Sequence, residues 1–298
     1  MTFNENADIS SGKVSRRGGG RGMKIGGGAG GGAIVIAIIV LLVQHFAGVD
    51  VSGVAGGLSG LQGQQIDTSG DEPLQCTAAE ANKDANCRIQ GAAALLQDYW
   101  AKQVQGYTDP EGIVIFDQST TTGCGSASTD MGPFYCPNDQ TIYIDPKFYD
   151  ELAQQFGDEA GALAQLYVIG HEWGHHIQNI TGTMKGKNLS ATGASSDSVR
   201  LELQADCYAG AWIGDAQAET DENGQHYLNP VTSDQITDAL NAAAAVGDDH
   251  IQQATQGSVN PESFTHGTSA ERQKWFNTGL NGEPADCQTF GIPASQLG

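Results

Sequence analysis

Apolar positions recur at helical spacing along most of the chain after residue 86. In residues 87–105, Ile89, Ala93, Leu96 and Trp100 fall on one face of a helix. The same spacing predicts a helix from about residue 158 to 179. Further helices are predicted in 195–217, 232–247 and 268–280, and a shorter one after Pro146, since proline suits the first turn of a helix.

Strand patterns are few, and they precede the helix predicted over 158–179. The segments "GIVIFD" (112–117) and "QTIYID" (140–145) are rich in β-branched and aromatic residues, as short strands are. Between them lies a segment rich in Gly, Ser and Thr (121–139), which indicates a loop. The chain is therefore predicted to have an α+β fold, mostly helical, with a small sheet.

Residues 25–43 are nineteen consecutive uncharged residues, close to the length of about 20 that a helix needs to cross a membrane. We predict a transmembrane anchor over 25–47. Its basic flank on the N-terminal side predicts a cytoplasmic tail over 1–24 and an extracytoplasmic chain beyond. A cleaved signal peptide is the alternative. Residues 48–75 have the Gly, Ser and Gln content of a flexible linker, which leaves 76–298 as the folded domain.

All six cysteines lie after the apolar segment, and their number is even. In an oxidising compartment this predicts three disulfides, for which 15 pairings are possible. Short loops favour Cys76–Cys87 and Cys124–Cys136, which leaves Cys207 with Cys287. No C-x-x-C spacing is present, so a thiolate zinc site is not expected.

The net charge of −21 is unevenly spread. Residues 1–32 carry a net of +3, so the remaining 266 residues carry −24. An acidic surface repels phosphates, which argues against DNA or RNA as partners.

The segment "VIGHEWGHHIQ" (168–178) contains the H-E-x-x-H pattern. On a helix, His171 and His175 lie one turn apart on the same face and can bind one metal ion, with Glu172 beside them as a general base. Nine uncharged residues precede His171, so the helix is expected to be buried. A buried helix does not carry two histidines and a carboxylate without partners. The pattern therefore predicts a zinc site.

Zinc in a catalytic site needs a third protein ligand. Glu202 and Asp206 in "ELQAD" (202–206) are again four apart on a predicted helix, and the spacing alone allows either of them.

With these motifs the chain resembles the bacterial putative neutral zinc metallopeptidase family of membrane-anchored proteins, and more distantly the M48-like peptidases, whose second helix carries E-x-x-A-D. The segments "GPFYCP" (132–137) and "HGTSAERQKWF" (266–276) are also similar to the family, and the resemblance covers about 76–290. It implies a zincin-like peptidase domain in which Glu202 is the ligand and Asp206 supports a histidine ligand. It also implies a site role for His266 and Arg272.

The resulting hypothesis is a zinc endopeptidase at the cell envelope that acts on proteins or peptides. Glu172 moves the protons, His266 and Arg272 assist at the reacting carbonyl, and residues 140–145 serve as an edge strand for an extended substrate. The alternatives are a zinc-stabilised binding module without turnover, and a peptidase kept latent by residues 121–139 acting as a lid.

Overall fold

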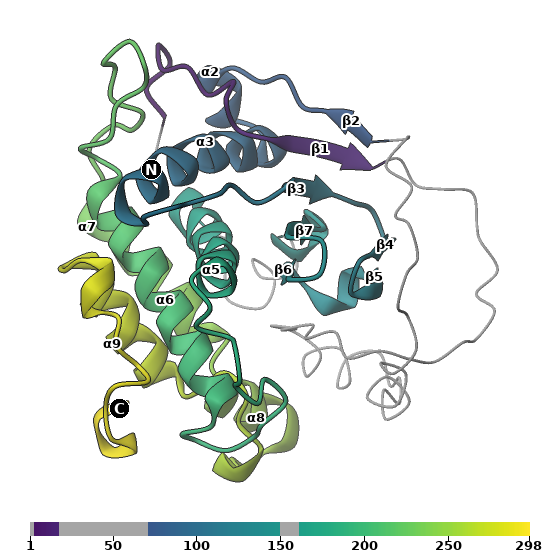
Figure 1. Cartoon of the computed structure of the whole chain (residues 1–298), viewed down its shortest axis with the longest axis vertical. Helices are drawn as coiled ribbons and strands as arrows, with labels where there is room; N and C mark the ends of the chain where they lie inside the picture. The colour runs from purple at the N-terminus through teal and green to yellow at the C-terminus, as the bar shows by residue number, and fades with distance from the viewer. Residues whose placement is uncertain (1–2, 18–70, 150–160) are drawn as a thin grey trace.

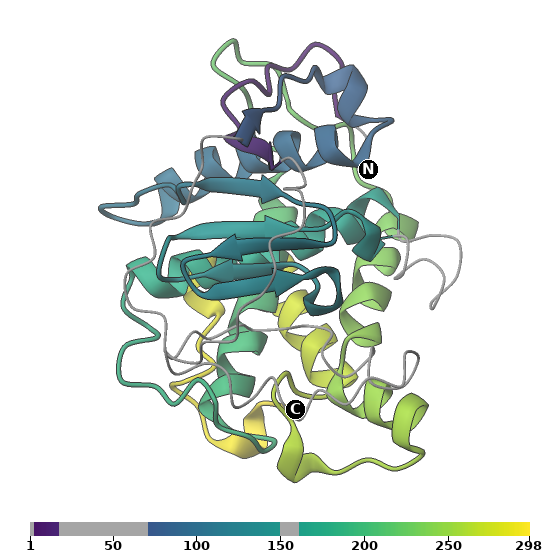
Figure 2. The same ribbon diagram turned by 90° about the vertical axis from the view of Figure 1, so that its right-hand side faces the viewer.

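Helices cover one face of a small mixed sheet, so the predicted α+β class is confirmed (Figures 1 and 2). The structure is a computed structural model that describes residues 3–17, 71–149 and 161–298. The helices are α2 Ala78–Ala81, α3 Ala85–Gln103, α5 Ala162–Ile180, α6 Asp197–Asp215, α7 Ser233–Ala245, α8 Asp248–Gln256 and α9 Ser269–Leu280. The strands are β1 Val14–Arg17, β2 Asp71–Pro73, β3 Gly112–Ile115, β4 Ser119–Thr122, β5 Gly125–Ser128, β6 Phe134–Cys136 and β7 Thr141–Ile144.

The main sheet has the strand order β2-β1-β3-β7-β6. Strand β3 pairs in parallel with β1 and β7, while β2 and β6 pair antiparallel to their neighbours at the two edges. The prediction that residues 140–145 form an edge strand is therefore wrong, since β7 lies between β3 and β6. The physical reason is that the predicted loop 121–139 folds back, and its last part pairs with β7 as the edge strand β6.

Side chains alternate across the sheet, as strand geometry requires. Ile113, Ile115, Ile142 and Ile144 belong to the main core, which the helices share. On the opposite face, Val114, Phe116 and Tyr143 pack with residues of the β4–β5 hairpin and β6 in a second, smaller core. Figure 1 shows this hairpin on the side of the sheet away from α5.

The predicted helices form where caps define their ends. Ser196 caps α6 by accepting a hydrogen bond from the Val199 backbone, and Thr268 with Glu271 forms a capping box at α9. Residues 147–149 are helical, and the rest of the helix predicted after Pro146 lies outside the described residues. Helix α8 was not predicted; its polar sequence "DDHIQQATQ" has few apolar positions.

The N-terminal residues require a correction. The tail predicted over 1–24 is not separate from the domain, because residues 14–17 form β1 inside the main sheet. The predicted linker also ends in structure, since residues 71–73 form β2. Buried apolar side chains at Phe3, Ile9 and Val14 explain why this segment folds with the domain.

Within the described ranges, no helix is long and apolar enough to cross a membrane. The predicted anchor over 25–47 lies outside the described residues, so it stays a prediction.

All three expected disulfides form: Cys76–Cys87, Cys124–Cys136 and Cys207–Cys287. The second joins the turn between β4 and β5, which contains Cys124, to Cys136 at the end of β6. The third fastens α6 to the C-terminal segment that follows α9.

Candidate metal centre

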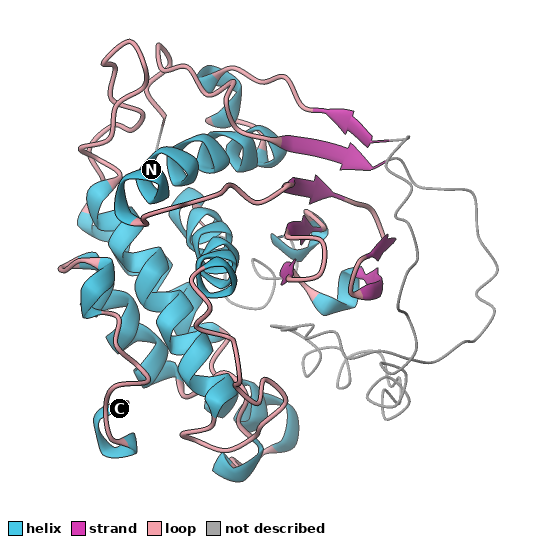
Figure 3. Ribbon diagram, in the orientation of Figure 1, coloured by secondary structure: helices cyan, strands magenta, loops and turns pink. Residues whose placement is uncertain are grey.

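Helices α5 and α6 lie side by side and carry the H-E-x-x-H and E-x-x-A-D residues respectively (Figure 3). Two glycines of α5 permit the close approach. A Cβ atom added at Gly174 would lie 3.1 Å from the Ala205 Cα atom, and one at Gly170 would lie 2.8 Å from the Trp212 ring. The sequence "GHEWGH" (170–175) thus presents both histidines and the surface that α6 packs against in the same two turns.

His171, His175 and Glu202 converge in the interior. His171 Nε2 lies 3.0 Å from Glu202 Oε2 and 3.2 Å from His175 Nε2, and His175 Nε2 lies 3.5 Å from Glu202 Oε1. All three side chains are buried. The structure therefore brings together the three residues for which the sequence predicted a common metal ion.

The hydrogen bonds on the far sides of the imidazoles orient both rings. His171 Nδ1 lies 2.8 Å from Asp206 Oδ1, and His175 Nδ1 lies 2.9 Å from Gln178 Oε1. A proton on each Nδ1 leaves both Nε2 lone pairs directed at the centre, where a carboxylate also points. Two imidazole nitrogens and one carboxylate oxygen form a donor set that suits zinc and leaves a fourth position open, so the residues present fit this metal.

The pKa values of the two imidazoles are shifted in opposite directions. Burial lowers the pKa of His171, but the Asp206 and Glu202 carboxylates outweigh it and raise the value to about 9. For His175, burial prevails and lowers the pKa to about 4.

Glu172 is buried beside this centre without a partner. Neither of its carboxylate oxygens has a hydrogen-bond partner, and neither does Glu202 Oε1. Burial raises the pKa of Glu172 to about 8. The negative charge of Glu202 also raises this pKa, whereas the charge of His171 lowers it. A buried carboxyl group with no partner is costly, so its free oxygens indicate a place for water, substrate or metal.

Asp206 connects three side chains, those of His171, Tyr167 and Arg272. Besides the imidazole, its carboxylate accepts hydrogen bonds from Tyr167 Oη at 2.6 Å, and from Arg272 Nε and Nη2 at 2.8 Å each. Arg272 is fully buried and also donates to the Val246 carbonyl. Its guanidinium thus faces Asp206 rather than the convergence point of the ligands, which supports a positioning role.

His266 lies on the turn before α9 and is nearly buried. Its Nδ1 lies 2.8 Å from Thr265 Oγ1 and 3.4 Å from Asp248 Oδ1. Burial lowers the pKa of His266, but the charges of Glu202 and Asp248 outweigh it and raise the value above that of a free histidine. The influence of Glu202 places His266 within electrostatic reach of the centre.

The sequence analysis missed three residues that orient the others. Tyr167 is four positions before His171, and Gln178 is three after His175, so helical spacing could have identified both. Asp248 accepts backbone hydrogen bonds from residues 265, 266 and 267 and holds the His266 turn in place. It lies on the unpredicted helix α8, and no sequence pattern pointed to it.

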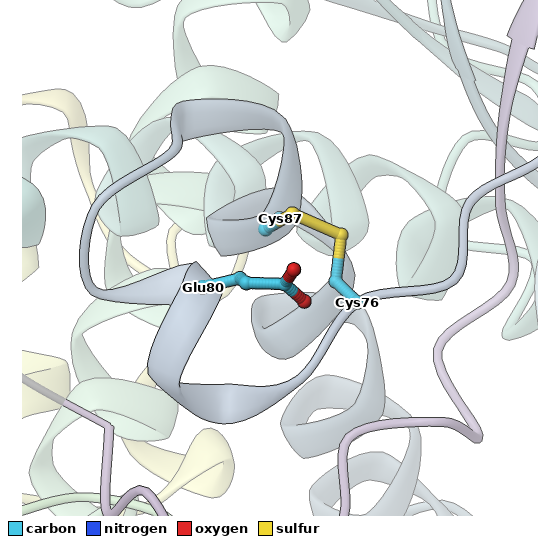
Figure 4. A group of neighbouring side chains, drawn as sticks. All are labelled: Cys76, Glu80 and Cys87. Carbon is cyan, nitrogen blue, oxygen red and sulfur yellow. A yellow bond between two sulfur atoms is a disulfide. The ribbon is translucent and has the colours of Figure 1, made fainter.

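A second cluster, Cys76, Glu80 and Cys87, has ligand-type atoms close together. Figure 4 shows its two sulfur atoms joined to each other, so neither is a free thiolate. Glu80 closes the capping box of α2. This cluster is structural.

The comparison with known proteins agrees with this geometry. The family model described as "Putative neutral zinc metallopeptidase" matches residues 4–290. An uncharacterized protein of Mycobacterium tuberculosis is 45% identical over 259 residues, which cover 84% of this chain and 85% of the relative. The uncharacterized protein YpfJ of Escherichia coli is 39% identical over 262 residues, with 84% of each chain covered. No solved structure matches.

Proposed function

We propose that this chain, which belongs to the putative neutral zinc metallopeptidase family, is a zinc-dependent endopeptidase that hydrolyses peptide bonds in proteins or peptides. One observation carries the proposal. The unpartnered carboxylate of Glu172 lies beside a buried centre of two Nε2 atoms and one carboxylate. A purely structural metal site has no use for such a carboxylate.

His171, His175 and Glu202 would hold the metal. When bound, zinc acts as a Lewis acid and lowers the pKa of a water molecule toward about 7. Glu172 takes a proton from the attacking water at a carboxylate oxygen and returns it to the nitrogen of the leaving amine. Its raised pKa suits a group that accepts and donates a proton near neutral pH.

Strand β6 is the proposed binding edge for the substrate, in place of β7. It is an edge of the main sheet, and the Tyr135 backbone lies outside hydrogen-bond geometry but close enough to Glu172 to lower the pKa of that carboxyl group. An extended peptide added to β6 would place a backbone carbonyl beside Glu172. With the edge strand β6 beside helix α5 and the third ligand on α6, the proposed site has a zincin-like arrangement.

His266 is proposed as a hydrogen-bond donor to the oxyanion that forms on the carbonyl. Its position before α9 and its electrostatic coupling to Glu202 support this role. Loss of one such donor typically costs about 2.7–4 kcal/mol of transition-state stabilisation. Arg272 is proposed to act indirectly, by holding Asp206 against His171.

We propose an extracytoplasmic location for the domain, supported by its three disulfides, which form and persist in oxidising compartments. Membrane attachment through residues 25–47 remains part of the proposal.

The test compares the zinc-loaded full chain with Glu172→Gln on casein and on quenched fluorescent peptides. We expect the variant to keep one zinc per chain, measured by mass spectrometry of the metal, and to lose at least about 10²-fold in kcat, a loss typical of a missing acid–base group. Glu262→Gln changes an exposed glutamate and serves as the matched control. Wild-type turnover by metal-loaded Glu172→Gln would refute the assignment. Zinc binding by the wild type without any turnover would favour a binding module.

A further inference from the structure

Residues 3–17 are anchored in the domain along their whole length. The Phe3 side chain is buried, and its backbone exchanges two hydrogen bonds with the Asn82 side chain, at 2.6 and 3.0 Å. The Ile9 carbonyl accepts a hydrogen bond from Gln90 Nε2 of α3. Gly12 lies so close to α3 that an added Cβ atom would be 2.2 Å from the Gln90 carbonyl oxygen. This is the packing of a core segment.

Strand β1 is also internal to the sheet. It separates β2 from β3 and forms backbone ladders with both (Figure 1). Without β1, strand β3 would expose an unpaired edge, and β2 would have no partner among the described strands. The family model also extends to this segment, since its match begins at residue 4. Residues 3–17 are therefore part of the peptidase fold itself.

The two described residues that flank 18–70 lie next to each other. Arg17 forms a forked ion pair with Asp71, in which Nε and Nη2 each lie 2.7 Å from a carboxylate oxygen. Both groups are largely buried, and Arg17 also donates to the Thr121 carbonyl. Bidentate pairs of this kind are the strong, geometrically specific ones. Arg17 and Asp71 therefore lie at a single place in the domain.

We infer that residues 3–17 and the catalytic domain lie on the same side of any membrane that residues 25–43 enter. A single crossing would separate β1 from β2 and β3 by the hydrocarbon core, about 30 Å thick, and would destroy the sheet. Arg17 and Asp71, which pair in the β1–β2 ladder on either side of residues 18–70, must then lie on that same side. On the extracytoplasmic location proposed above from the three disulfides, that side is outside the cytoplasm.

This inference conflicts with the charge-based prediction of a cytoplasmic N-terminus. Three of the five basic residues in 1–32, Lys13, Arg16 and Arg17, lie in or next to β1, and Arg17 is neutralised by Asp71. A base already paired in a folded sheet is not available to hold a tail at the cytoplasmic face. The packing therefore outweighs the positive-inside pattern here.

The test is thiol labelling of the full chain in cells. Ser11→Cys and Ser258→Cys each add one exposed thiol, the first in the N-terminal segment and the second after α8. A charged, membrane-impermeant maleimide is applied to intact and to permeabilised cells. We expect the two positions to react alike in both conditions. Labelling of one position in intact cells and of the other only after permeabilisation would overturn the inference.

A second measurement tests the strand pairing itself in the membrane fraction. Arg16 and Glu72 are exposed and lie opposite each other in the β1–β2 ladder. In the double variant Arg16→Cys/Glu72→Cys, the new disulfide should keep the N-terminal fragment attached to the domain on a denaturing, non-reducing gel after proteolysis within 18–70. The matched control Ser11→Cys/Glu72→Cys, whose positions are not ladder partners, should release it. Release of the fragment from both variants would contradict the inference.

Discussion

Asp206 determines the geometry of the metal centre although it is not one of the proposed ligands. Burial alone would raise its pKa, but Arg272 and His171 hold the pKa of this carboxyl group well below its usual range. The ionised carboxylate therefore fixes the Nδ1 proton of His171, and Arg272 with Tyr167 fixes the carboxylate. Partners of this kind typically change metal affinity by 10–100-fold.

The buried pair of Arg272 and Asp206 gives a residue-scale prediction. Arg272→Ala should destabilise the zinc-loaded protein by about 3–5 kcal/mol, because it leaves a buried carboxylate without its cation. Arg272→Lys should recover only part of this, since an ammonium group cannot form the fork. Urea unfolding measures the effect, and Lys274→Ala on the exposed face of α9 is the control. Equal stability of Arg272→Ala and the wild type would show that the pair is dispensable.

Spacing predicted His171, Glu172 and His175 because four positions on a helix fix one face. It could not choose between Glu202 and Asp206, which share a face of α6. The structure separates them, since Glu202 approaches the Nε2 side of His171 and Asp206 the Nδ1 side. The position of Arg272 depends on how α9 crosses α6. The sequence therefore suggested that Arg272 lies near the site, but it did not show which group the guanidinium faces.

The crossing of α6 and α9 is set by glycines that remove side chains from the contact. A Cβ atom at Gly279 would lie 1.9 Å from the Cys207 carbonyl oxygen, and one at Gly210 would lie 2.1 Å from that of Phe276. Both obstacles are backbone atoms, which cannot move aside without shifting a helix. The contact positions Glu202 and Asp206 on α6 relative to Arg272 on α9.

Gly279→Ala is the corresponding element-scale prediction. We expect a loss of about 3 kcal/mol, at the upper end for overpacked cores, with weakened zinc binding because the two helices must separate. Denaturant unfolding and zinc titration measure the two effects. Gly291→Ala is a matched control, since a Cβ atom there would meet only the Gln288 side chain, at 4.0 Å. Wild-type values for Gly279→Ala would mean that the helices have more freedom than the contact indicates.

The helices were better predicted than the strands, and the reason is physical. Helices α5, α6, α7 and α9 have local periodicity, and α6, α7 and α9 also have side-chain caps. Strands β4 and β5 are rich in Ser, Thr and Gly, and they exist because they pair with each other beneath the Cys124–Cys136 disulfide. The position of β7 inside the sheet and the presence of β1 in it depend on strand partners that are far away in sequence. Hydrophobic spacing carries no information about which strands pair.

For the molecule as a whole, the centre joins parts of the chain that are far apart in sequence. Helix α5 supplies two histidines, α6 a glutamate, and the turn before α9 is held by Asp248 of α8. The Cys207–Cys287 bond fastens α6 to the C-terminal segment. A ligand bound at the centre therefore stabilises the whole domain and not only a single loop.

Removal of zinc should consequently lower the stability of the whole domain. A ligand present at 100 times its Kd, with no affinity for the unfolded chain, stabilises by about 2.7 kcal/mol. At about 2–4 °C per kcal/mol for large domains, Tm should fall by roughly 5–10 °C when a chelator removes the metal. Calorimetry with zinc, with chelator, and with zinc restored measures the shift. His175→Ala, which lacks one ligand, should show a much smaller shift, whereas an unchanged Tm on chelation of the wild type would mean that His171, His175 and Glu202 do not hold a stabilising metal.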